Sequence, residues 1–127
     1  MTDADKGRGS PSPQRQQGYR RGHTAEIAAA AFLIAKGHRI LARRYKTSAG
    51  EIDLIVIRAK RIGFVEVKRR ATLCECEAAI TSRLQQRVRR AAELWIAKNP
   101  RFQSHDIGFD LVFVTPWRWP VHLRDGL

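Results

Sequence analysis

The first regular pattern in the chain is an apolar repeat between Thr24 and Gly37, in the segment TAEIAAAAFLIAKG. Ile27, Ala31 and Ile34 recur there at the spacing of one face of an α-helix. Thr24 has a side chain favoured at a helix N-cap, and glycine is the residue that commonly follows the last helical turn. The pattern predicts a helix that starts at Thr24 and stops at Gly37.

Apolar residues also repeat every three or four positions in AITSRLQQRVRRAAELWIAK, which is followed by Asn99 and Pro100. Proline ends such a pattern because it lacks the amide hydrogen that a helix interior needs. The segment predicts a second helix. Its apolar side is formed by Leu84, Val88, Ala91, Ala92 and Trp95, and its opposite face by Arg83, Arg87 and Arg90.

Runs rich in β-branched and aromatic residues indicate strands. HRILARRYK precedes the turn TSAG, and EIDLIVIRA and RIGFVEVKR are separated by a short break at Ala59 and Lys60 that predicts a hairpin. GFDLVFVT follows the second helix, and PVHLRDGL predicts a short edge strand after the turn WRWP. The order of helix, three strands, helix and strand predicts an α/β fold with helices packed on the faces of the sheet.

Acidic residues interrupt the apolar pattern of the predicted hairpin. Side chains alternate between the two faces of a strand, so Asp53 shares a face with Glu51, and Glu66 shares one with Lys68. A two-residue turn places Asp53 directly opposite Glu66, and Glu51 opposite Lys68. The reverse face of the first strand is then expected to carry Ile52, Leu54 and Val56.

Two carboxylates directly opposed at about 5 Å repel each other, so this arrangement needs compensation. A divalent cation can supply it, since Mg²⁺ binds one or two carboxylates together with waters and phosphate oxygens. Ile55 and Ile57 continue the same face into apolar sequence, which places the acids at the end of a covered strand. An unpaired carboxylate there is costly and is often retained for chemistry. The alternative is an exposed hairpin face with ordinary cross-strand ion pairs.

The charge of the chain indicates a polyanionic partner. Its 127 residues include 24 Lys and Arg against 12 Asp and Glu, a formal net charge of +12. Such a protein releases counterions from nucleic-acid phosphates whatever the base sequence. Membrane surfaces and ribonucleoprotein particles attract the same charge, which therefore defines no activity. No apolar run approaches the roughly 18 residues of a membrane span, so we expect one cytoplasmic domain without a membrane partner.

The N-terminal segment differs in composition from the rest of the chain. Residues 1–22 are rich in Gly, Ser, Pro, Gln and Arg and contain no apolar stretch that could act as a secretory signal or offset the entropy of ordering. We expect a disordered basic tail over residues 1–22 and an α/β domain over residues 23–127. Cys74 and Cys76, expected in a loop, lack the spacing of a zinc site or a disulfide framework, so reduced thiols are expected.

The segment GEIDLI, followed by FVEVK in the next strand, resembles the motif of the PD-(D/E)xK nuclease superfamily. Asp53 matches its aspartate, and Glu66 and Lys68 match its ExK. With AExxAAxFL in the first helix and GFDLVFV near the C-terminus, the chain resembles the YraN-type bacterial family, whose fold is similar to that of archaeal Holliday-junction resolvases. The resemblance extends from about Gly18 to the C-terminus.

This resemblance implies a restriction-endonuclease-like mixed β-sheet flanked by helices, and a Mg²⁺- or Mn²⁺-dependent centre that acts on DNA or RNA. Asp53, Glu66 and the main-chain carbonyl of Val67 are expected to hold the cation, and Lys68 to orient a water or stabilise the phosphorane. Glu26 matches an acid of the family's first helix that could hold the water or a second ion. The alternative for Glu26 is an acid of the first helical turn, favoured by the helix dipole. Nucleic-acid contacts are expected from Arg69, Arg70, Arg83, Gln85, Arg87 and Arg90.

Three positions depart from the family pattern. Leu84 stands where relatives tend to have lysine, Gly108 where many have arginine, and the segment around Cys74 and Cys76 replaces a loop with Tyr or Phe before Gly. These differences concern substrate contacts and leave the expected metal ligands unchanged.

Two functions remain open from the sequence. One is a metal-dependent nuclease acting on structured DNA or RNA, and the other is a nucleic-acid-binding module that keeps the fold without turnover. The acid-acid-lysine set favours the enzyme, because carboxylates that face a substrate weaken simple phosphate binding. A ribonucleoprotein scaffold explains the charge but not the carboxylates. No small-molecule cofactor is expected, and the resolvase-like relatives of the fold add a homodimer as an alternative to a monomer.

Overall fold

The computed structural model describes residues 13–127, with side chains from His23 onward. The chain contains both helices and strands, with three consecutive strands after the first helix, as the sequence predicted. The elements are α1 (Pro13–Ala35), β1 (Arg39–Thr47), β2 (Gly50–Arg58), β3 (Arg61–Arg69), α2 (Leu73–Ala78), α3 (Ser82–Lys98), a 3-10 turn (Pro100–Phe102), β4 (Asp106–Val114) and β5 (Val121–Leu123).

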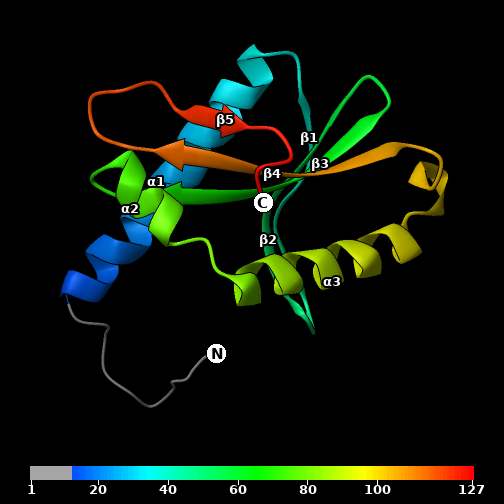
Figure 1. Ribbon diagram of the computed structural model, residues 1–127, viewed down its shortest axis with the longest axis horizontal. Helices are drawn as coiled ribbons and strands as arrows, with labels where there is room; N and C mark the ends of the chain where they lie inside the picture. Colours follow the sequence, from blue (N-terminus) through cyan, green and yellow to red (C-terminus); the bar gives the residue numbers. More distant parts are fainter. Residues whose placement is uncertain (1–12) are drawn as a thin grey trace.

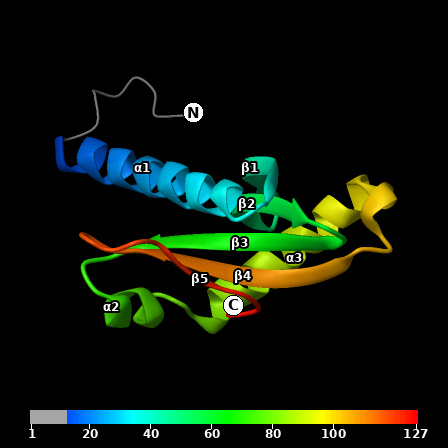
Figure 2. The same cartoon turned by 90° about the horizontal axis from the view of Figure 1, so that it is seen from above.

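The five strands form one mixed sheet in the order β1-β2-β3-β4-β5. All neighbours are antiparallel except β3 and β4, which are parallel because α3 carries the chain back across the sheet between them. Figure 2 shows α1 on one face of the sheet and α3 on the other, and Figure 1 shows α3 crossing below the strands. The predicted α/β domain with a mixed sheet flanked by helices is confirmed, and it is consistent with a restriction-endonuclease-like fold.

Each face of the sheet has its own apolar core. Alternation along β2 and β3 sends Ile55 and Phe64 toward α3, and Leu54 and Val65 toward α1. The small alanines of α1 allow that helix to lie close on its face, whereas the α3 face holds larger side chains. The α1 core consists of Ala29, Ala30, Leu33, Leu54, Val56, Val65 and Val112.

Helix α1 begins at Pro13, so the predicted start at Thr24 is wrong. Residues 13–22, assigned from the sequence to a disordered tail, form the first turns of this helix. Gln and Arg have good helix propensity, which lets the helix extend beyond the part that packs on the sheet. Residues 1–12 of the predicted tail lie outside the described residues. Over residues 13–127, no helix is long and apolar enough to cross a membrane.

The predicted end of this helix is confirmed. Gly37 has φ +94°, a left-handed conformation that costs glycine little. The amide of Gly37 donates to the carbonyl of Ile34 at 2.9 Å, and that of His38 donates to Leu33 at 3.0 Å. This pair of bonds is a Schellman motif, which satisfies carbonyls that the helix end would otherwise leave free.

The cysteine segment is the short helix α2, not the loop that we expected. Thr72 acts as its N-cap, with Oγ1 accepting from the amide of Glu75 at 3.1 Å, and Glu75 Oε1 accepts in turn from the amide of Ala71. This reciprocal capping stabilises a single turn that has no strong apolar repeat. Cys74 is exposed and Cys76 buried, and neither forms a disulfide.

Candidate functional site

The β2–β3 hairpin determines where the acidic residues lie. The predicted two-residue turn at Ala59 and Lys60 is confirmed, because Arg58 pairs with Arg61. This register continues to the pair Leu54 and Val65, where the ladder ends. Asp53 and Glu66 therefore stand immediately beyond the last paired residues, at the point where β2 and β3 separate. Strands that separate leave space between them for side chains.

The β1–β2 ladder keeps one register on both sides of Asp53, and its register shift lies between Ile40 and Ala42. The ladder pairs Tyr45 with Ile52 and Arg43 with Leu54. Arg44, which lies between the paired residues of β1, has φ +51°.

Two positions in this hairpin differ from the prediction made by strict strand alternation. Ile52 packs in the α3 core together with Ile55, so it does not share the face of Leu54 and Val56, as we had predicted. The expected apposition of Glu51 and Lys68 is also wrong, because the β2–β3 ladder does not extend that far. Both departures follow from the separation of β2 from β3 at Asp53.

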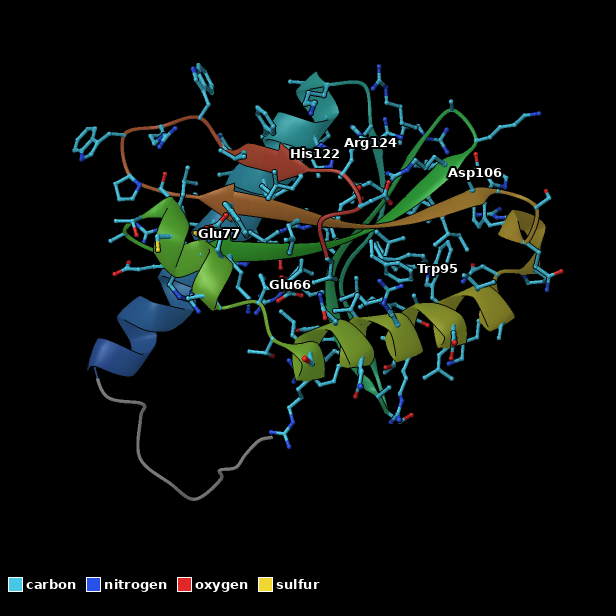
Figure 3. All side chains as sticks on the ribbon, in the orientation of Figure 1. Glu66, Glu77, Trp95, Asp106, His122 and Arg124 are labelled. Atoms are coloured by element: carbon cyan, nitrogen blue, oxygen red, sulfur yellow. The ribbon has the colours of Figure 1, made fainter. Side chains whose placement is uncertain are left out.

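Asp53, Glu66 and Lys68 are brought together. Asp53 Oδ2 accepts a hydrogen bond from the amide of Val67 at 2.8 Å, which fixes its carboxyl group beside β3. The charge of Glu66 reaches Asp53 and acts on its carboxyl group. Lys68 Nζ lies 3.2 Å from Glu66 Oε2. Figure 3 shows Glu66 below β3, on the side where α3 lies. The exposed-hairpin alternative does not hold for Glu66, which is only 7% exposed.

Burial raises the pKa values of both carboxyl groups. Burial, and next the charge of Glu66, raise the pKa of Asp53 to about 7, although the amide of Val67 and the charge of Lys68 oppose the shift. Burial also raises the pKa of Glu66 despite its contact with Lys68. Perturbed carboxyl groups of this kind concentrate at functional sites.

Glu26 of α1 is the third acid of this region. It is 5% exposed, and its charge contributes to the raised pKa of Asp53. Its carboxyl oxygens lie 3.6 Å from Arg43 Nη2 and 3.7 Å from Arg44 Nε, and Oε1 accepts no hydrogen bond. Because α1 begins at Pro13, Glu26 is not in its first turn, and the helix-dipole alternative is wrong.

The raised pKa of Asp53 predicts a pH-dependent cost to stability. The folded protein binds the proton more tightly than the unfolded chain, whose ordinary value is 3.8. The stabilisation is thus complete below about pH 4 and lost as the pH rises to about 7. Asp53→Asn removes this dependence. Urea unfolding in EDTA should show the variant gaining about 1–3 kcal/mol over wild type between pH 4 and pH 8. A gain that does not change with pH would contradict the assigned shift.

Helix α3 adds positive charge to this site. The stem of Arg87 packs over Gly50, where an added Cβ would lie 3.6 Å from its Cβ, and the charge of Arg87 lowers the pKa of Glu66. Arg87 is exposed, as predicted for the charged face of this helix, and its charge reaches the carboxylates. Thr81 caps the helix by accepting from the amide of Leu84 at 3.1 Å. Among the other residues predicted to contact nucleic acid, Gln85 is half-buried. The exposed ones are Arg69, Arg70, Arg83 and Arg90.

The donor set at Asp53 and Glu66 suits a small, hard cation. Mg²⁺ is commonly held by one or two carboxylates, with water and phosphate oxygens completing its shell. Two neighbouring carboxyl groups whose pKa values are raised can hold such an ion in place of their protons. Among the described residues, no three His, Cys, Asp or Glu side chains form a metal-binding group, so the protein would supply only part of the coordination.

Sequence reasoning assigned no role to Asp110, which is 0% exposed in β4. Arg61 binds it through two hydrogen bonds, with Nη1 to Oδ2 at 3.0 Å and Nη2 to Oδ1 at 2.8 Å. His122 Nε2 lies 3.2 Å from Oδ2, and the amide of Asp125 donates to Oδ1 at 2.9 Å. The signal for this cluster was an aspartate within the apolar run GFDLVFV.

Two paired glycines provide the space for this cluster. Gly63 and Gly108 are neighbours across the parallel β3–β4 ladder. A Cβ added at Gly63 would lie 2.9 Å from Asp110 Oδ2, and one added at Gly108 would overlap the guanidinium of Arg61. Arg61 therefore occupies the region into which an arginine at position 108 would extend.

The fold and the site together define a single-domain α/β protein with two neighbouring carboxyl groups, of which Glu66 is buried, beside a lysine, at the point where two strands of a mixed sheet separate. The chain belongs to the uncharacterised protein family UPF0102, which it matches over residues 25–114. This agrees with the resemblance to the YraN-type family.

Similar proteins match nearly the whole chain. The UPF0102 protein mlr4633 of Mesorhizobium japonicum is 48% identical over 116 residues, which cover 91% of this chain and 93% of that protein. A UPF0102 protein of Rhodopseudomonas palustris strain BisB5 is 50% identical over 113 residues, covering 89% of this chain and 86% of the relative. UPF0102 protein R00337 of Rhizobium meliloti is 44% identical over 116 residues, which cover 91% of this chain and 95% of that protein.

Proposed function

We propose that this protein is a metal-dependent nuclease that cleaves the phosphodiester backbone of structured DNA or RNA. The observation that carries the proposal is the convergence of Asp53, held beside β3 by the amide of Val67, with the buried Glu66 and with Lys68, which contacts Glu66. A structural protein gains nothing from two carboxyl groups whose burial raises both pKa values. A phosphoryl-transfer centre needs such a pair to hold a cation against the substrate.

Each residue has a separate role in this proposal. Asp53 and Glu66, with the carbonyl of Val67, hold Mg²⁺ or Mn²⁺. When bound, the cation acidifies a water and neutralises charge on the scissile phosphate. Lys68, held in place by Glu66, orients the attacking water or donates to the phosphate oxygens. Glu26, whose Oε1 accepts no hydrogen bond, is available to accept one from that water.

The charge near the site supports a nucleic-acid substrate. Arg87 faces the carboxylates, and the exposed Arg69 and Arg70 follow Lys68 along the chain. Arginines placed in this way contact the phosphate backbone and position it without reading bases. The affinity for nucleic acid should therefore fall steeply as the salt concentration rises.

The connection between β4 and β5 lies at the same end of the sheet as the end of β3. Arg69 pairs with Val114, and three residues later Trp117 is fully exposed, as Trp119 largely is. Exposed aromatic side chains next to arginines are the groups on which unpaired bases stack. Trp117 and Trp119 therefore support substrates that have single-stranded or branched regions.

A binding module without turnover is the second candidate. The net charge of +12 and the exposed tryptophans support it as well as they support the enzyme. The buried carboxylates distinguish the two, because they repel a phosphate unless a cation lies between them. We therefore favour the nuclease.

A cleavage screen tests the proposal. Branched, single-stranded and duplex DNA and RNA should each be incubated with the purified full chain in Mg²⁺ or Mn²⁺, beside Asp53→Ala. We expect metal-dependent cleavage of at least one substrate by wild type and none by the variant. Binding of all substrates without metal-dependent cleavage would support the binding module and reject the enzyme.

A further inference from the structure

A second site lies at the other end of the β2–β3 hairpin. Arg58, at the turn, is five residues from Asp53 along β2, which at about 3.3 Å per residue places it roughly 17 Å away. A cavity of about 690 Å³ opens here between the end of α1, the hairpin turn and β5. It is lined by Lys36, His38, Arg58, Ala59, Lys60, Arg61, Asp106, His122 and Arg124. Figure 3 shows His122, Arg124 and Asp106 above β4, away from Glu66.

The charges around this cavity are not balanced. Arg61 is neutralised by the buried Asp110 and by Asp125, whose Oδ1 is 3.0 Å from Arg61 Nη2. Among the described residues, the other cations of the lining have no carboxylate partner, and Asp106 is the one acidic residue of the lining. Four cations thus face a single carboxylate: Lys36, Arg58, Lys60 and Arg124.

The wall of the cavity is held rigidly. His122 is fixed on one side by Asp110, and its Nδ1 lies 3.1 Å from Lys36 Nζ. His38 Nδ1 donates to the carbonyl of Leu33 at 3.1 Å, and its ring meets that of His122 edge-on at 5.6 Å. Because β5 and the end of α1 are tied together in this way, the cations around them are carried by an ordered framework.

The positive charges around the cavity also affect the buried side chain of His38. Burial lowers the pKa of His38, and the nearby charges of His122, Arg58 and Lys36 lower it further. A positive field that reaches a buried imidazole favours an anion in the cavity. The four cations are exposed along the lining, so an anionic ligand with several acceptor oxygens can contact more than one of them.

We propose that this cavity binds a phosphate-bearing ligand, either a free nucleotide or the phosphorylated end of a nucleic-acid strand. Phosphate groups carry the multiple charges that an excess of cations requires, and arginine binds them through paired hydrogen bonds. The volume exceeds what inorganic phosphate needs and falls within the range of small-molecule pockets. This site is separate from the Asp53 centre and does not depend on the nuclease proposal.

Isothermal titration of the full chain with pyrophosphate and with ATP, in EDTA and moderate salt, tests the proposal. Arg58→Gln/Arg124→Gln should lose about tenfold or more in affinity, because two charge-assisted contacts disappear. The matched control Lys46→Gln/Lys98→Gln removes two exposed charges elsewhere and should stay within about twofold. Lys68→Ala should bind pyrophosphate as wild type does. Thermal melting shows that each variant is folded.

The two sources of the phosphate are separated by a second titration with one oligonucleotide carrying either a 5′-phosphate or a 5′-hydroxyl. A preference for the phosphorylated form that disappears in Arg58→Gln/Arg124→Gln identifies the strand end. Tight binding of ATP without such a preference identifies a free nucleotide. Equal losses in the cavity variant and in the lysine control, or no saturable binding of any phosphate ligand, would overturn the proposal.

Discussion

Asp53→Asn is expected to lower metal-dependent cleavage by about a thousandfold or more. The carboxylate is one of two charged groups that would hold the cation, and the amide that replaces it has similar shape but no charge. Loss of the cation removes both the acidified water and the neutralisation of the phosphate, so the effects combine. Cleavage should be measured in Mn²⁺ at pH 8, where wild-type Asp53 is ionised.

The same substitution should have the opposite effect on binding. In EDTA, Asp53→Asn should bind nucleic acid as well as wild type or slightly better, because a negative charge facing the phosphates has been removed. Lys68→Ala should lower cleavage strongly and weaken binding only modestly. Glu51→Gln is a matched control on the same strand, since Glu51 is exposed and pairs with Lys46 of β1, and it should leave cleavage within about twofold.

Some outcomes would contradict the assignment of the centre. Cleavage that persists undiminished in both Asp53→Asn and Lys68→Ala would belong to a contaminant or to another site. If the protein is a binding module, only the change in nucleic-acid affinity in EDTA should be seen, and wild type should not cleave any substrate. The paired measurement therefore separates the two functions with the same three proteins.

The sequence predicted most of the fold because its strongest signals are local. The two-residue turn at Ala59 and the helix stop at Gly37 each depend on a few neighbouring residues, and both are present. The start of α1 at Pro13 could not be predicted, since propagation of a polar helix from a packed segment leaves no apolar pattern. The turn of α2 was missed because reciprocal capping by Thr72 stabilised it without periodicity.

The prediction of the site assumed that side chains alternate regularly between the two faces of each strand. The register of the hairpin, read from the turn, was sufficient to bring Asp53 beside Glu66. Alternation failed at Ile52 because the strands separate at Asp53, and local sequence does not encode that separation. Asp110 was missed for another reason. Its partners, Arg61 and His122, come from distant parts of the chain, and only the folded topology brings them to one carboxylate.

Asp110→Asn is expected to destabilise the protein by about 3–5 kcal/mol, which is the usual cost of removing one partner of a buried ion pair. Burial would raise the pKa of Asp110, but hydrogen bonds from Arg61, His122 and the amide of Asp125 outweigh it and hold that pKa well below its usual range. The substitution leaves Arg61, whose side chain is 16% exposed, without its main counter-charge. Domains of this size have only about 5–15 kcal/mol of total stability, so the loss should be large in urea unfolding.

Asp125→Asn is the matched control for that measurement. Asp125 also contacts Arg61, but its side chain is 68% exposed, so the same chemical change there should cost no more than about 1 kcal/mol. Because the pKa of Asp110 is lowered on folding, its contribution is present above about pH 4 and lost as the pH falls below that value. The difference between Asp110→Asn and wild type should therefore shrink on acidification. Equal losses for the two variants at pH 7 would mean that the buried carboxylate does not stabilise the junction of β3, β4 and β5.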